Sequence, residues 1–226
     1  MIKFKEILEL WRKDNSLTQA YHDSEVMLEN AYEMFVESVR ILRHTDSADG
    51  REELRERDSL LNKYEREVRR KVLKYLAVTG GTNIIPGLIL TSIVIDFERI
   101  GDYTKNIADL AKMHPERLNA GKHEEQLQKI EKTTEALFKN LLPILLSSEK
   151  ERAKQCINDS FWVLKASDKI VEDCVTATDP QLKPGTSTAV ALYVRYVKRV
   201  AAHLINVATS IVNPFEKIGF LLDETK

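Results

Sequence analysis

The fold is decided around the stretch DFERIGDYTKNIAD, residues 96–109. Apolar or small side chains recur in and beside it at alternating steps of four and three, at Ile93, Phe97, Ile100, Thr104, Ile107 and Ala111. This spacing places all six on one stripe of an α-helix. Glu98 and Asp102 are one turn apart and point almost opposite the stripe. Because two stacked carboxylates repel each other, we expect something positive beside them.

The composition is that of a protein built from long helices. The chain has 226 residues, enough for one large or two small domains with a sizeable core. Aromatic residues make up 7%, and there are only 8 Gly and 6 Pro. With 34 basic and 35 acidic residues the net charge is −1, so no global field draws the chain to nucleic acid or to a membrane.

Export and membrane signals are weak. The N-terminal sequence MIKFKEILELWRKDN is too charged for a secretory leader, and the run from Leu88 to Ile95 is too short to span a bilayer. Cys156 and Cys174 fall in one predicted helix, about 27 Å apart, and cannot form a disulfide within it. We therefore expect a reducing, cytoplasmic location.

Hydrophobic periodicity predicts six long helices after residues 1–14, which we interpret as an arm packed on the body or, alternatively, as a membrane-surface anchor. The capping box Ser16-Leu17-Thr18-Gln19 opens the first helix, which should end near Arg43. The second ends at Gly80-Gly81, the third covers Ile85 to Lys112, and Pro143 should kink or end the fourth. The fifth covers Glu151 to Thr176, and the sixth ends before Pro214.

The chain also repeats itself. A shift of 100 residues lays Arg99 on Arg199, Asn106 on Asn206 and Ala108 on Ala208. We therefore predict an all-α fold, a tandem of two three-helix bundles. The predicted division is an arm at 1–14, a first bundle at 15–115, a second at 122–213 and a tail at 214–226.

The central stretch resembles a known family. ERIGDYTKNIA, residues 98–108, is similar to the E-R-I-x-D-x-x-x-N-I-A signature of PhoU proteins, regulators of phosphate uptake. RYVKRVAAH, residues 195–203, resembles its second copy, and NPFEKI, residues 213–218, is similar to some PhoU-like chains. The resemblance implies two three-helix bundles side by side and a homodimer.

The resemblance also implies surface clusters of iron or zinc. In the first repeat the implied ligands are Glu98 and Asp102, with Asp58 leaning in from the second helix. Carboxylate oxygens suit such cations. The alternative is an ordinary solvated helix face with Lys105 as a counter-ion. Asp109, on the same line, is expected to be plain surface.

The second repeat departs from this pattern. Lys198 and Ala202 stand where the family has Glu and Asp, and neither an ammonium nor a methyl group has a lone pair to donate to a metal. We therefore expect the second metal site to be absent. Arg195, Lys198 and Arg199 instead form a basic patch that could meet an anion or an acidic partner.

Two further features leave alternatives open. The basic ribbon, defined here as Lys63, Arg66, Arg70 and Lys74, is either a docking surface or a solvated face paired with Glu65 and Glu67. His203 and Asn206 are expected to pack between helices. The sequence has no Glu-x-x-His pair, which argues against a ferritin-like di-iron oxidase.

The hypothesis we favour is a non-enzymatic, cytoplasmic regulator. It would dock on a phosphate transporter, an ABC-type ATPase or a sodium/phosphate symporter, or on a phosphate-sensing histidine kinase, and would be peripheral to the membrane only through that partner, with no nucleic-acid binding. The alternatives are a metal-dependent hydrolase and a metal-free helical scaffold. The sequence shows no phosphate-binding Gly-rich loop, nucleophile elbow or catalytic base.

Overall fold

The computed structural model describes residues 15–46, 49–79 and 84–220. Their six long helices are α2 (Asn15–His44), α3 (Arg51–Val78), α4 (Ile84–Met113), α5 (Glu124–Ser147), α6 (Lys150–Val175) and α7 (Pro184–Val212), with the short 3-10 turns η1 (Gly121–His123) and η2 (Phe215–Lys217). These described segments contain no β-strand. The six predicted helices are confirmed, whereas the predicted arm, residues 1–14, lies outside the described residues.

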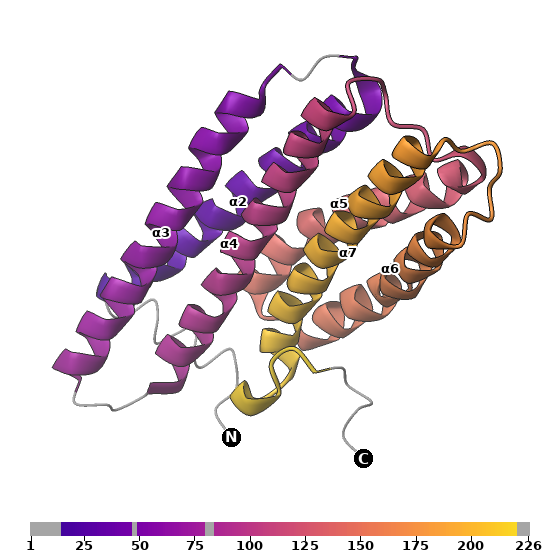
Figure 1. Ribbon diagram of the computed structural model, residues 1–226. Helices are drawn as coiled ribbons and strands as arrows, with labels where there is room; N and C mark the ends of the chain where they lie inside the picture. The colour runs from indigo at the N-terminus through magenta and orange to yellow at the C-terminus, as the bar shows by residue number, and fades with distance from the viewer. Residues whose placement is uncertain (1–14, 47–48, 80–83, 221–226) are drawn as a thin grey trace.

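The helices form two three-helix bundles that lie side by side (Figure 1). Helices α2, α3 and α4 pack against one another, as do α5, α6 and α7. The bundles meet mainly where α4 packs on α7, with a smaller contact between α2 and α5. The two helices that carry the repeated signature are therefore the inner helices of the molecule.

The predicted stripes form the core. On α3 the heptad positions Leu54, Leu61, Val68 and Tyr75 are all buried. The stripe of α4 is buried as well, including Thr104, whose hydroxyl donates to the carbonyl of Gly101 at 2.7 Å. On α7 the apolar stripe is buried at all seven of its positions, which are Val190, Tyr193, Val197, Val200, Leu204, Val207 and Ile211. Each large apolar side chain removed from water contributes about 1.5–3 kcal/mol, so these stripes fix how the helices face one another.

Glycine brings α3 and α4 close together near the signature. A Cβ atom at Gly101 would lie 2.5 Å from Cδ1 of Leu61, which is 1% exposed. Gly87 makes a similar approach to Val72, where a Cβ would lie 2.8 Å from Cγ1. The packing of α3 against α4 in the first bundle is therefore suited to glycine at these two positions. The place corresponding to Gly101 in the second bundle holds Ala201, which is fully buried.

Helix α5 continues past Pro143 to Ser147. Pro143 has no N–H to donate to the carbonyl of Lys139, so it removes one intrahelical hydrogen bond without ending the helix. The helix then ends at Ser148, whose φ of 56° is left-handed and whose backbone N–H donates to the carbonyl of Ile144.

Candidate functional site

The three predicted metal ligands lie close to one another on facing helices. Asp58 comes from α3, and Glu98 and Asp102 come from α4. Nζ of Lys105 lies between two of them, donating to Oδ2 of Asp58 at 2.7 Å and to Oδ1 of Asp102 at 3.1 Å. Asp58 therefore leans toward α4 as expected, but what it meets there is an ammonium group of the chain itself.

Arg99 supplies a second positive charge on the same face. Its Nη1 donates to Oδ2 of Asp102 at 3.2 Å, and its Nε lies 3.5 Å from Oε2 of Glu98. The side chain of Glu98 is only 15% exposed, so the carboxylate lies against the protein and does not stand out in solvent as the sequence suggested. The expected positive partner of the stacked carboxylates is thus provided by Lys105 and Arg99.

Burial and charge shift the pKa values of this cluster. Burial raises the pKa of Glu98 above its usual 4.5, and the neighbouring charge of Asp102 raises it further. Burial lowers the pKa of Lys105, but its hydrogen bonds to Asp58 and Asp102 outweigh that effect and leave the pKa above 10.5. The lysine therefore stays charged and holds the two aspartates together.

This geometry is that of an ion-pair cluster. Within residues 15–46, 49–79 and 84–220, no three His, Cys, Asp or Glu side chains are placed so that they could jointly hold a metal ion. The nearby Asp109 is also paired, since Nη2 of Arg55 on α3 donates to it at 3.1 Å. The carboxylates do not fit a metal while Lys105 lies between them, and the iron or zinc site stays a prediction.

The corresponding face of the second bundle has a different pairing. Nζ of Lys198 on α7 lies 2.5 and 2.6 Å from the two carboxylate oxygens of Asp168 on α6. Ala202 offers no polar group. Asp168 was missed in the sequence because nothing in its surroundings on α6 distinguishes it from other surface carboxylates. Asp168 neutralises Lys198, one of the three positive charges of the basic patch.

A polar seam joins the bundles between α4 and α7. Nδ1 of His203 lies 2.7 Å from Oδ1 of Asp96, and Nδ2 of Asn206 donates weakly to the same oxygen at 3.4 Å. The His203 ring stacks on Tyr103, and Nε of Arg199 donates to the Tyr103 hydroxyl at 3.1 Å. The prediction that His203 and Asn206 pack between helices is confirmed.

A buried network links three helices at the α2–α5 contact. The Arg43 side chain, 3% exposed, donates to Oε1 of Glu124 at 2.5 Å and to Oε1 of Glu131 at 2.9 Å. The hydroxyl of Tyr193 on α7 donates to the same Glu131 oxygen at 2.6 Å. Burial, reinforced by the charge of Glu131, raises the pKa of Tyr193 well above its usual value. No local sequence pattern predicts this network, because its members are far apart in the chain.

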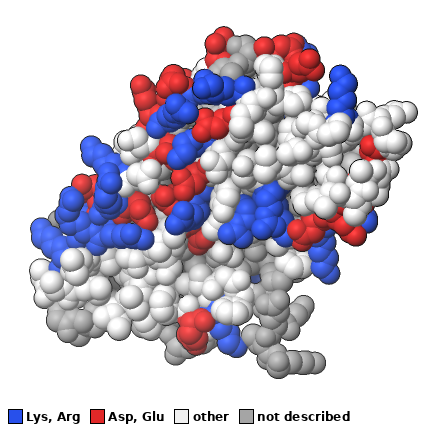
Figure 2. All heavy atoms as spheres, in the orientation of Figure 1, with Lys and Arg blue, Asp and Glu red and all other residues white. Residues whose placement is uncertain are grey.

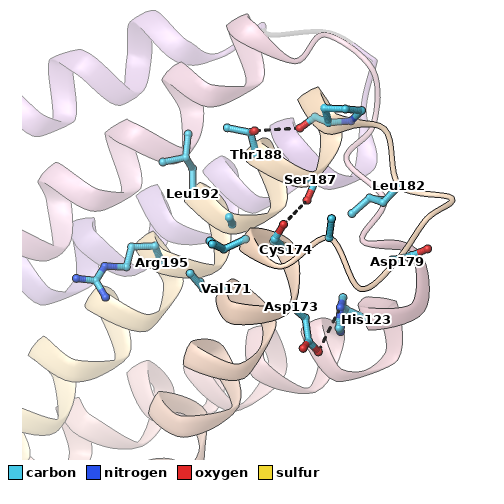
Figure 3. Close-up of a pocket in the computed structure, with 14 residues that line it drawn as sticks. His123, Val171, Asp173, Cys174, Asp179, Leu182, Ser187, Thr188, Leu192 and Arg195 are labelled. Carbon is cyan, nitrogen blue, oxygen red and sulfur yellow. Dashed lines mark hydrogen bonds and ion pairs between the residues drawn. The ribbon is translucent and has the colours of Figure 1, made fainter.

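The second bundle contains a cavity of about 580 Å³ at its end, between α6, the α6–α7 connection and α7 (Figure 3). Its lining is largely apolar, with Val171, Leu182 and Leu192 among the walls and Arg195 at one side. Nε2 of His123 lies 3.8 Å from Oδ2 of Asp173, and burial lowers the pKa of His123 below its usual 6.5.

Neither cysteine is disulfide-bonded. Both lie on α6, as predicted. Burial raises the pKa of Cys156 to about 11 and raises that of Cys174, which lines the cavity. Thiols with raised pKa values are poor nucleophiles. Among the helices that the structure describes, none is both long and apolar enough to cross a bilayer.

Comparison with known proteins identifies the signature-bearing half of the chain. The model of the PhoU domain family matches residues 25–111, which span most of α2, all of α3 and nearly all of α4. The first bundle is therefore similar to a PhoU domain. The match lies over the bundle that carries Glu98 and Asp102, in keeping with the altered signature of the second bundle.

Solved structures extend the likeness to the whole fold. The chain resembles PhoU from Pseudomonas aeruginosa with a TM-score of 0.75 and 19% sequence identity, over 87% of this chain and 95% of that one. It also resembles the phosphate transport system regulatory protein PhoU from Streptococcus pneumoniae, with a TM-score of 0.76 and 15% identity, over 86% and 92% of the two chains. At such identities the likeness shows a shared fold. No curated protein matches the sequence significantly.

Proposed function

We propose that this protein is a non-enzymatic regulator of phosphate transport that acts as a helical adaptor. The observation that carries the proposal is the similarity to a PhoU domain over residues 25–111. The PhoU fold over most of the chain supports it, since a solved structure with this fold is named as a phosphate transport system regulatory protein. Six long packed helices give extended, stiff surfaces suited to binding another protein.

The proposed setting is the cytoplasm, where the chain acts as a homodimer. Its partner is a phosphate transporter, either an ABC-type ATPase or a sodium/phosphate symporter, or a phosphate-sensing histidine kinase. These assignments follow from the family resemblance. The α3–α4 face of the first bundle and the α6–α7 face of the second both consist of ion pairs. A partner's charged side chains could replace one member of such a pair, which agrees with a docking role.

A metal-dependent hydrolase is the alternative that the site supports less well. Hydrolysis at a metal needs an open coordination position and a base beside it. Here the carboxylates of Asp58 and Asp102 are already paired with Lys105. We propose that iron or zinc binds Asp58, Glu98 and Asp102 only in a state in which Lys105 has moved away.

The metal proposal is tested by elemental analysis of untagged protein, comparing the wild type with Glu98→Ala/Asp102→Ala. Iron or zinc at a fixed ratio in the wild type, and its loss in the double variant, would support the site. Lys105→Met removes the competing ammonium and should raise the metal content. Equal, negligible metal in all three proteins would leave the cluster as an ion-pair network alone.

The regulatory function is tested in cells that lack the gene. If the protein restrains uptake, radiolabelled phosphate should enter such cells several-fold faster when phosphate is plentiful, and the wild-type gene should restore the slow rate. The Glu98→Ala/Asp102→Ala gene tests in the same assay whether this face takes part. Unchanged uptake and unchanged expression of phosphate-responsive genes after deletion would refute the proposed function.

A further inference from the structure

Charge is unevenly distributed along the chain. Residues 68–95 contain Arg69, Arg70, Lys71 and Lys74 but no Asp, Glu or His. This stretch carries a charge of +4, although the whole chain carries −1. In the structure three of these four cations are paired, Arg69 with Glu65, Arg70 with Glu67 and Lys71 with Asp23, so the positive charge of this segment that no described residue pairs is at Lys74.

The same segment exposes apolar side chains at one end of the first bundle. Leu73 is 69% exposed, Val78 is 78% exposed and Ile84 is 44% exposed. We call these three residues the apolar tip. Helix α3 ends and α4 begins at this end, at the lower left of Figure 1. Exposed apolar side chains are common singly, but these three fall within the last six residues of α3 and the first residue of α4.

The basic ribbon lies beside the apolar tip on α3. Figure 2 shows Lys and Arg side chains gathered on the side of the molecule formed by α3, with uncharged surface below them. Arg70 is paired with Glu67 at 2.7 Å, so the predicted solvated pairing holds for that residue. Arg66 and Lys74 are exposed and have no ion pair with any described residue. They are available to an external anion.

The equivalent end of the second bundle provides the contrast. Val78 and Val175 are the last residues of α3 and α6, and they are 78% and 77% exposed. Each is followed by a threonine whose hydroxyl donates back to a helix carbonyl, Thr79 to Tyr75 and Thr176 to Glu172. The last turn of α6 contains two acidic residues, whereas that of α3 contains none.

We propose that the apolar tip and the basic ribbon form a surface that binds anionic lipid membranes. Leu73, Val78 and Ile84 would enter the boundary between head groups and acyl chains, while Arg66 and Lys74 lie against lipid phosphates. Apolar burial combined with basic side chains is what peripheral membrane binding requires. Arg66 and Lys74, which pair with no described residue, leave positive charge beside the exposed apolar side chains, which suits a flat anionic surface. This binding is a property of the chain itself and does not require the partner in the proposed function.

The test is flotation of the full-length protein with lipid vesicles. The protein should float with vesicles containing phosphatidylglycerol, and not with vesicles of phosphatidylcholine alone, and added salt should weaken binding. Lys74→Gln should weaken binding roughly fivefold, as expected for one basic side chain at an anionic surface. Leu73→Gln/Val78→Gln should weaken it by about tenfold or more, through the loss of buried apolar area.

Val175→Gln is the matched control, since it changes an equally exposed valine at the same place in the second bundle. It should bind vesicles as the wild type does, and circular dichroism should show wild-type helicity for all variants. The proposal is overturned if the wild-type protein does not float with vesicles that contain phosphatidylglycerol. It is likewise overturned if Leu73→Gln/Val78→Gln binds these vesicles as the wild type does. It is also overturned if light scattering shows a dimer that this variant dissociates without lipid, because a second copy would then cover the tip. Phosphate uptake is measured separately, so either proposal can fail alone.

Discussion

The α3–α4 face of the first bundle and the α6–α7 face of the second share a helical framework but differ in chemistry. In the first, Asp58, Glu98 and Asp102 surround Lys105 and Arg99. In the second, Lys198 pairs with Asp168, and Ala202 takes the place that corresponds to Asp102.

The difference shows that the packing of three helices into a bundle does not depend on which charged residues lie on its outer polar face. Both faces are held by an aspartate from the second helix of the bundle and a lysine from the third. Replacing a carboxylate with a lysine at position 198 changes the sign of the face while the buried stripe of α7 remains intact. The core and the site therefore vary independently, and the site has to be judged residue by residue.

The largest expected effect concerns the close approach of α3 and α4 at Gly101, a position that Ala201 takes in the second bundle. Gly101→Leu would push a side chain into Leu61, because even a Cβ would lie 2.5 Å from its Cδ1. We expect a loss of about 3 kcal/mol in the free energy of unfolding, measured by urea denaturation. Gly185→Leu is the control, since a Cβ there meets nothing within 4 Å, and it should stay within about 0.5 kcal/mol of the wild type. Equal effects of the two substitutions would contradict the close approach.

A smaller effect should distinguish the two aspartates. The Asp58 side chain is 12% exposed and holds the half-buried Lys105, so Asp58→Ala should cost about 1–2 kcal/mol of unfolding free energy. The Asp168 side chain is 56% exposed, so water screens its pairing with Lys198, and Asp168→Ala should cost less than about 0.5 kcal/mol. Chemical denaturation of both variants in parallel provides the measurement. A larger loss from Asp168→Ala would show that the second face is the more important for stability.

The smallest effect is a pH dependence specific to the second bundle. Burial holds the pKa of His123 below its usual 6.5, so the unfolded chain takes up a proton more readily than the folded one. The contribution of neutral His123 to the free energy of unfolding is therefore present above pH 6.5 and declines as the pH falls below that value. We expect His123→Gln to lessen this decline, as measured by thermal unfolding between pH 5 and 8. Identical pH profiles for wild type and variant would show that His123 does not contribute.

Hydrophobic periodicity predicted the fold in detail because the helices are long and regular. In α4, the predicted stripe of six residues is buried without exception, and the helix bounds differ from the prediction by one residue at each end. The same periodicity treats every residue outside the stripe as solvated. It therefore could not predict that Glu98 has only 15% of its side chain exposed.

The sequence by itself determined the six helices, their buried stripes, the repeat and the altered second signature, because each depends on residues close together in the chain. Only the tertiary structure decided which charges meet. Lys105 with Asp58, Lys198 with Asp168, and Arg43 with Glu124 and Glu131 are all pairs from different helices. Such contacts depend on the rotation and spacing of packed helices, set here by Gly101 and the core side chains, and no local pattern records them.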